Sequence, residues 1–150
     1  MLKVTLSSGQ PYDLDVGSVL RIRRSIESDA LPIGKTRIDA AIQLQVLETP
    51  EATASAVKGE LPSLVRFTTA DGTSVWTDAK KAKGPWYVPP PNLGNGVKSA
   101  FAVGGKIQYV AEDPETVSGI ISSGGGTPLP IYKSLRDLPV SDEPPLEEWD

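Results

Sequence analysis

Few residue types in this chain could carry out acid–base or metal chemistry. Among its 150 residues there is no histidine and no cysteine. Their absence removes the usual general base, the thiolate nucleophile, the disulfide and the standard zinc ligands. Carboxylates and lysines remain, so a carboxylate-based hydrolase stays open as an alternative, which would need two acids about 5–10 Å apart across a pocket. We expect no catalytic residue, no metal and no cofactor.

Two short motifs look catalytic but have simpler explanations. The tripeptide Gly34-Lys35-Thr36 resembles the end of a phosphate-binding loop, yet Asp29 stands where the first glycine of that loop belongs. A carboxylate facing a phosphate has the wrong sign, so we do not expect nucleotide binding. The acidic run at 112–115 lies at the start of a predicted helix, where capping and the helix dipole explain it.

Five basic residues could form a stripe that neutralises phosphates: Arg21, Arg23, Arg24, Lys35 and Arg37. In a strand, Arg21 and Arg23 share one face, and the other bases could lie next to them. The alternative, which we favour, is a solvated sheet face whose charge is balanced by Asp13, Asp15 and Asp39. Residues 1–60 carry seven bases and eight acids, which argues against strong nucleic-acid binding.

The aromatic residues form the part of the chain most typical of a contact surface. Trp86 and Tyr87 stand among four prolines, and Trp76 should point away from the core if its strand alternates. Aromatic and proline residues in an exposed loop fit a protein interface. The alternative is that Trp86 and Tyr87 fold back over the core as a lid. We take all three residues as candidate partner-binding residues.

The chain repeats itself, and this repeat sets the expected architecture. Gly9 and Lys35 recur 63 positions later as Gly72 and Lys98, and Pro50 recurs 64 positions later. Alternating apolar residues predict strands in the first repeat at 2–6, 12–16, 19–24, 36–38 and 42–47. Thr49 and Pro50 then predict a helix to about Val57. The second repeat shows matching signals at 65–69, 75–77 and 107–111, followed by a helix from Asp113.

We therefore predict a mainly β (α+β) protein with two tandem small β-sheet modules, each ending in a short helix. Residues 1–60 form the first module, 61–121 the second, and 122–150 a glycine linker with an extended, proline-rich, acidic arm. The arm carries six acids against two bases, which accounts for the net charge of −4. It has too little apolar content to fold by itself, so it is either disordered or folds onto a partner. Its candidate anchors are Ile131, Tyr132, Leu135 and Trp149.

The repeats resemble the flagellar FlbD-like family of small bacterial proteins. The matching positions in the first repeat are Thr5, Gly9, Tyr12, Leu14, Thr36, Ile38, Val46, Glu48, Thr49 and Val57. Those in the second repeat are Thr68, Gly72, Val75, Ser99, Phe101, Val110, Glu112 and Val117. The resemblance implies a β-rich module that ends in a helix. Family members are single modules without an acidic tail, and their motility role does not follow from the fold.

The sequence favours a non-enzymatic structural or assembly protein that contacts other chains through its loops and arm. A subunit of a phage or virus-like particle is the most concrete form of this hypothesis, by analogy. The partners would be other protein subunits, with copies of the same chain among the candidates, rather than nucleic acid or membrane. The alternative is a bacterial regulatory adaptor of the FlbD-like kind that touches nucleic acid through Arg21–Arg24. No apolar run approaches the ~20 residues of a membrane span, so we expect a soluble protein, in the cytoplasm or in a particle assembled there.

Overall fold

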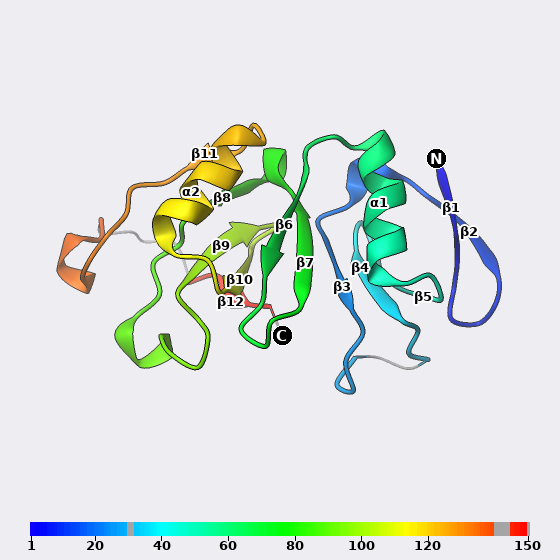
Figure 1. The fold of residues 1–150 in the computed structure, drawn as a ribbon, viewed down its shortest axis with the longest axis horizontal. Helices are drawn as coiled ribbons and strands as arrows, with labels where there is room; N and C mark the ends of the chain where they lie inside the picture. Colours follow the sequence, from blue (N-terminus) through cyan, green and yellow to red (C-terminus); the bar gives the residue numbers. More distant parts are fainter. Residues whose placement is uncertain (30–31, 140–144, 150) are drawn as a thin grey trace. The chain divides into compact units, whose positions relative to one another are not determined.

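The computed structural model describes residues 1–29, 32–139 and 145–149, and this part of the chain is mainly β with two α-helices (Figure 1). The expected fold class is confirmed. The chain divides into two compact units, which do not coincide with the sequence repeats. Unit 1 comprises Met1–Arg66 and Ser74–Asp78, and unit 2 comprises Phe67–Thr73 and Ala79–Asp150.

Unit 1 begins with an antiparallel hairpin of β1 (Leu2–Thr5) and β2 (Pro11–Leu14). Its turn requires glycine, because Gly9 has a φ of 91°, in the left-handed region that other residues rarely adopt. Val4 and Leu14 are buried in the core of the unit. The alternation at 2–6 and 12–16 therefore predicts this hairpin correctly.

The main sheet of unit 1 contains β3 (Arg21–Arg24), β4 (Thr36–Asp39), β5 (Gln43–Val46) and β7 (Ser74–Asp78). The strand order is β5-β4-β3-β7-β6, and β6 (Leu64–Thr68) passes from unit 1 into unit 2. β7 belongs to the second repeat by sequence but pairs antiparallel with β3 of the first, with Trp76 opposite Ile22. A strand of one repeat thus extends the sheet of the other.

One face of this sheet is apolar and packs against α1 (Pro50–Glu60), which contacts β3 and β4. Ile22, Ile38 and Leu44 share one buried cluster with Val57 of the helix. The Thr49 side chain caps the helix by accepting a hydrogen bond from the Ala52 amide at 3.2 Å, as the sequence predicts. The helix continues to Glu60, beyond the predicted end at Val57.

Unit 2 contains a second five-stranded sheet of order β11-β8-β9-β10-β12. Its strands are β8 (Ala82–Gly84), β9 (Ser99–Val103), β10 (Lys106–Val110), β11 (Thr127–Pro128) and β12 (Glu147–Glu148). The helix α2 (Pro114–Ser123) packs against β8, β9 and β11, and its Val117 and Ile121 are buried. Short 3-10 turns occur at Val16–Ser18 in unit 1 and at Ala79–Lys81, Pro90–Asn92 and Leu135–Asp137 in unit 2.

The predicted glycine linker is a fixed turn. Ser122 and Ser123 belong to α2, and the Gly126 amide donates to the Ile121 carbonyl at 2.8 Å. A Cβ added to Gly126 would lie 2.0 Å from the Ala79 carbonyl oxygen, so glycine is needed there for close packing rather than for freedom. A run of glycines in a sequence does not by itself show whether the glycines serve chain flexibility or close packing.

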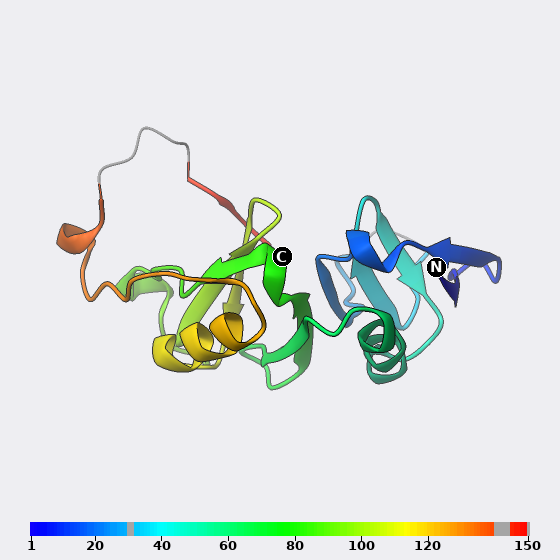
Figure 2. The ribbon, with the colours of Figure 1, turned by 90° about the horizontal axis from the view of Figure 1, so that it is seen from above.

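The predicted arm returns to unit 2 at both edges of its sheet. β11 pairs parallel with β8, and β12 pairs parallel with β10, with Glu147 opposite Lys106. Between them the chain passes from β11 through the 3-10 turn at Leu135–Asp137 (Figure 2, orange). Residues 140–144, which belong to the predicted arm, lie outside the described residues.

Several contacts inside unit 1 recur inside unit 2 at positions 63 or 64 residues later. The Thr5 amide donates to both carboxylate oxygens of Glu48 at 3.0 and 3.1 Å, and the Thr68 amide donates to those of Glu112 at 2.9 and 3.0 Å. Two backbone hydrogen bonds recur as well. The bond from the Leu47 amide to the Thr5 carbonyl matches the bond from the Ala111 amide to the Thr68 carbonyl. The bond from the Lys35 amide to the Val46 carbonyl matches the bond from the Lys98 amide to the Val110 carbonyl. The strand entering each hairpin is thereby tied to the residues just before each helix.

Candidate protein-binding groove

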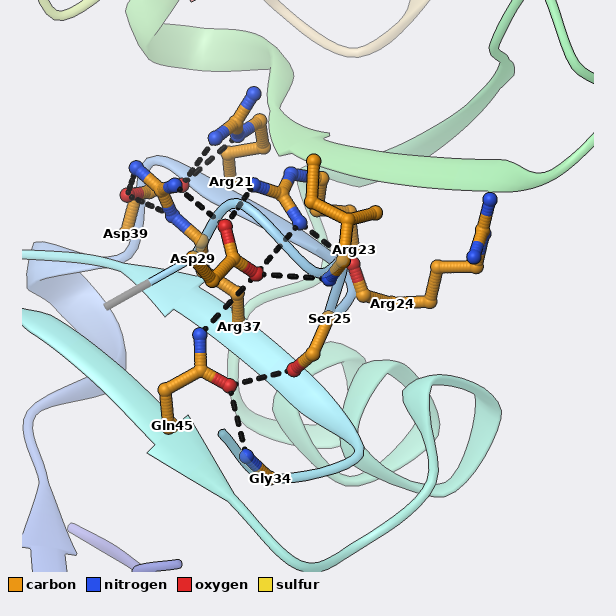
Figure 3. A network of polar contacts seen from close by, with 10 residues as sticks. Arg21, Arg23, Arg24, Ser25, Asp29, Gly34, Arg37, Asp39 and Gln45 are labelled. Carbon is orange, nitrogen blue, oxygen red and sulfur yellow. Dashed lines mark hydrogen bonds and ion pairs between the residues drawn. The ribbon is translucent and has the colours of Figure 1, made fainter. Parts of the chain in front are cut away.

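The side chains of Arg21 and Arg23 of β3 and Arg37 of β4 lie together, and acidic side chains engage them (Figure 3). Alternation places Arg21 and Arg23 on the sheet face opposite α1, with Arg37 beside Arg23 in the register. The Arg21 guanidinium contacts the Asp39 carboxylate at 2.8 Å, and Arg37 contacts the other oxygen of Asp39 at 2.9 Å. Asp39 therefore bridges two arginines.

Asp29 is the second anion of this cluster, and it accepts hydrogen bonds from several groups. Arg23 donates to both Asp29 oxygens, at 2.7 and 3.1 Å, and Arg37 donates to one at 3.1 Å. The Gln45 amide and the Ile26 backbone amide donate to the same carboxylate at 3.2 and 2.9 Å. Burial alone would raise the pKa of Asp29, but these arginines and amides hold it well below its ordinary value.

The cluster differs from both interpretations of the basic residues, the phosphate-binding stripe and the solvated sheet face. Asp39 takes part as expected, but the second partner is Asp29, whereas Asp13 pairs with Lys3 and Asp15 caps the turn at Gly17. The face is also buried rather than solvated, since Arg21 is 0 % and Arg23 6 % exposed. Arg24 and Lys35 are exposed. We name these five cluster residues the ionic face of unit 1: Arg21, Arg23, Asp29, Arg37 and Asp39.

Unit 2 has a groove of about 120 Å³ that brings together residues far apart in the sequence. One wall is the loop before β9, with Trp86 and Tyr87, and the other is the segment after β11, with Ile131 and Tyr132. Pro85, Pro90, Pro114 and Pro130 add flat apolar surface to the lining. Four of the seven predicted partner-binding residues therefore meet at one site.

The groove also has polar groups that could form ion pairs or hydrogen bonds with a ligand. Lys98 and Lys133 line it, and neither makes an ion pair within the described part of the chain. Ser99 lines it as well, is 2 % exposed, and its Oγ has no hydrogen-bond partner among the described residues. A buried hydroxyl without a partner costs free energy, so such a group at a groove marks a position where a ligand can donate or accept.

Trp86 is held in place from outside the groove. The Trp86 amide donates to the Ala100 carbonyl at 2.8 Å, and the Lys83 ammonium lies 5.4 Å from the centre of its ring. The Leu129 amide donates to the Gly84 carbonyl at 2.8 Å, which fixes the other wall one strand away. The Trp86 wall is therefore anchored to β9 and the Leu129 wall to β8.

The other three predicted contact residues lie elsewhere. Trp76 does not point away from the core as expected: it packs half-buried against the core of unit 1, because it stands opposite Ile22 on the face that α1 covers. Leu135 is 62 % exposed on the last 3-10 turn. Trp149 is 9 % exposed, and its amide donates to the Ile107 carbonyl at 2.7 Å, beside β10.

Sequence reasoning did not select Lys98 and Ser99 as groove residues. A signal was present, because Ser99 corresponds to Thr36, whose hydroxyl donates to the Glu48 carbonyl at 2.7 Å. The shorter serine has no such bond at the matching position. When one copy of a motif has a shorter polar side chain than the other, the shorter side chain can lack the hydrogen bond that the longer one makes.

No group of three or more acidic residues that could hold a metal ion occurs among residues 1–29, 32–139 and 145–149. In those same residues, neither helix is long and apolar enough to cross a membrane. The groove lining contains apolar, basic and hydroxyl side chains and no described carboxylate. Such a lining can bind an extended chain through flat apolar contacts, ion pairs and one hydrogen bond.

Comparison with protein-family models, with curated proteins and with solved structures found no match. The groove and the ionic face are therefore interpreted from their own chemistry.

Proposed function

We propose that this chain is a non-enzymatic structural or assembly protein that binds another protein chain in the groove of unit 2. The observation that carries the proposal is the convergence of Trp86, Tyr87, Ile131 and Tyr132 on one hollow beside a buried serine hydroxyl without a partner. Aromatic residues dominate binding energy at protein interfaces because each buries a large area at a small entropic cost.

A role as a subunit of a phage or virus-like particle is the most concrete form of this proposal. It is supported by the small β-rich units and by a C-terminal segment that attaches as added strands at sheet edges. The recurring contacts between Thr5 and Glu48 and between Thr68 and Glu112 support the further proposal that the two halves arose by duplication.

The rival of a regulatory adaptor that contacts nucleic acid draws less support. Of the residues Arg21–Arg24 that this rival needs, Arg21 and Arg23 have charges that already meet Asp39 and Asp29. Freeing them would require breaking buried ion pairs, which costs several kcal/mol for each uncompensated charge.

The test is to purify the chain at its natural abundance from its own cells and to identify what accompanies it. A Trp86→Ala/Tyr132→Ala variant should lose the partner, because it removes an aromatic side chain from each wall of the groove. Ile42→Ala is the matched control, since Ile42 is 56 % exposed in unit 1. Retention of every partner by the groove variant would contradict the proposal. Truncation at Gly124 is less informative, because it also removes β11 and β12 from the sheet of unit 2.

A further inference from the structure

We infer that the groove of unit 2 takes an extended, acidic, proline-containing segment of a partner chain. This inference rests on the proposed function, and it names the chemistry of the partner. Three features of the groove select that chemistry: its flat apolar walls, its two lysines and the hydroxyl of Ser99.

The flat walls favour proline. Trp86, Tyr87 and Tyr132 present rings, and the prolines of the lining keep the hollow shallow and rigid. Segments in the polyproline II conformation dock in aromatic-lined grooves because they are already extended and lose little entropy on binding. The groove volume of about 120 Å³ suits one or two side chains of such a segment rather than a helix.

The surface already holds a segment of this kind from its own chain. Pro128 pairs with Gly84 as part of β11, and Pro130 and Ile131 continue along the groove wall. An extended stretch with alternating prolines therefore already forms part of the same lining as Trp86. A partner segment would lie against the same aromatic residues from the open side.

The Ser99 hydroxyl favours an extended backbone over a folded element. A polyproline II segment makes no internal hydrogen bonds, so its carbonyl groups are free to accept one. Ser99 Oγ can donate to such a carbonyl, and the desolvation cost of the buried hydroxyl is then offset. A helix would offer no free carbonyl along its side.

The charges favour an acidic segment. Lys98 and Lys133 make no ion pair with any described residue, and Lys83 lies over Trp86 nearby. Among the described acids, Asp113 lies close enough to Lys98 to feel its charge, and the Asp113 carboxylate also accepts a hydrogen bond from the Thr116 amide. Carboxylates on either side of a proline pair would complement this lysine-rich rim.

The experiment uses the full chain and a fluorescein-labelled peptide of sequence Asp-Glu-Pro-Pro-Asp-Glu-Glu, which differs from residues 142–148 of the chain in lacking the leucine that packs beside β10. Two matched peptides serve as controls, one with both prolines replaced by alanine and one with every acid replaced by lysine. Fluorescence anisotropy should show binding of the first peptide that weakens about tenfold or more in each control. Raising the salt concentration should weaken it further, because the lysine contacts are exposed.

Protein variants assign the contacts. Ser99→Ala should weaken peptide binding about threefold to tenfold, the size of one hydrogen bond, without lowering the stability of the protein. Lys98→Gln/Lys133→Gln should abolish most of the salt dependence, and Lys3→Gln in unit 1 is the matched control. Equal binding of all three peptides, or no binding at about 1 mM peptide, would overturn the inference. If the natural partner is still lost from the Trp86→Ala/Tyr132→Ala variant in that case, the proposed function stands and only the peptide chemistry is wrong.

Discussion

The two units cover the sheet face opposite their helix in different ways. In unit 1, Arg37 pairs with Gln45 across β4 and β5, on the ionic face. At the matching positions of unit 2, 63 and 64 residues later, Ala100 pairs with Tyr109 across β9 and β10. The unit 2 face is apolar: Ala100 and Ile107 form a buried cluster with Val88, and Trp86 and Leu146 pack against it.

The difference fits the position of the long loop and the C-terminal segment of unit 2, which pack on its sheet. The ionic face of unit 1 satisfies its own charges, so strand residues and one loop carboxylate are enough to complete it. The apolar face of unit 2 gains free energy only when other groups remove it from water. Residues 85–97 and 146–149 supply those groups.

Removing the central anion of the ionic face should have the largest effect. Asp29→Ala leaves the guanidinium groups of Arg23 and Arg37 without their shared carboxylate, and we expect the free energy of unfolding to fall by about 3–5 kcal/mol. Urea denaturation measures this loss. Glu27→Ala, an exposed acid two residues away, should change stability by less than about 0.5 kcal/mol. A small loss of stability in Asp29→Ala would mean that the arginines of the ionic face do not depend on the Asp29 carboxylate.

Uncovering the apolar face of unit 2 should have the next largest effect. Leu146→Ala/Trp149→Ala removes the apolar contacts of the C-terminal segment, and we expect a loss of about 2–3 kcal/mol in the stability of unit 2. Hydrogen exchange read peptide by peptide should show faster exchange in β9 and β10 and no change in β4 and β5. Leu135→Ala is the control, because Leu135 is 62 % exposed. Equally faster hydrogen exchange in both units would contradict the view that the C-terminal segment covers the sheet of unit 2 alone.

The sequence predicted the elements that depend on local signals. The hairpin turn at Gly9 and the cap at Thr49 follow from backbone conformation and capping chemistry, which neighbouring residues determine. The pairing of β7 with β3 could not be predicted, because both strands alternate and nothing local specifies which edges meet.

The candidate site was predicted in part for the same reason. Trp86, Tyr87, Ile131 and Tyr132 stand out by residue type, but their meeting depends on β11 docking beside β8. The ionic face was misread because Asp29 enters from a loop, which the strand pattern does not place. Contacts between distant parts of the chain bring the groove residues together and place Asp29 in the ionic face, and a single sequence carries little information about such contacts.

Acid should weaken the ionic face of unit 1. The pKa of Asp29 in the folded state lies below its ordinary value of 3.8, so the stabilisation is complete above that value and is lost as the pH falls towards the folded pKa. The contribution of Asp29 should be about 1 kcal/mol smaller at pH 3 than at pH 7. Urea unfolding of the wild type and of Asp29→Asn at both pH values checks this, because the difference between them should shrink at pH 3. An unchanged difference would contradict the assigned direction of the pKa.

The smallest expected effect tests the comparison at a single hydroxyl. Thr36→Val removes the hydrogen bond that the Thr36 hydroxyl donates to the Glu48 carbonyl in unit 1, and should cost about 1 kcal/mol. Ser99→Ala removes the matching hydroxyl of unit 2, which has no partner among the described residues, and should cost nothing or raise stability slightly. Hydrogen exchange of β4 and β9 measures the two changes separately. Equal losses would mean that the Ser99 hydroxyl is already bonded within the protein, and the groove would then have no spare donor to offer a ligand.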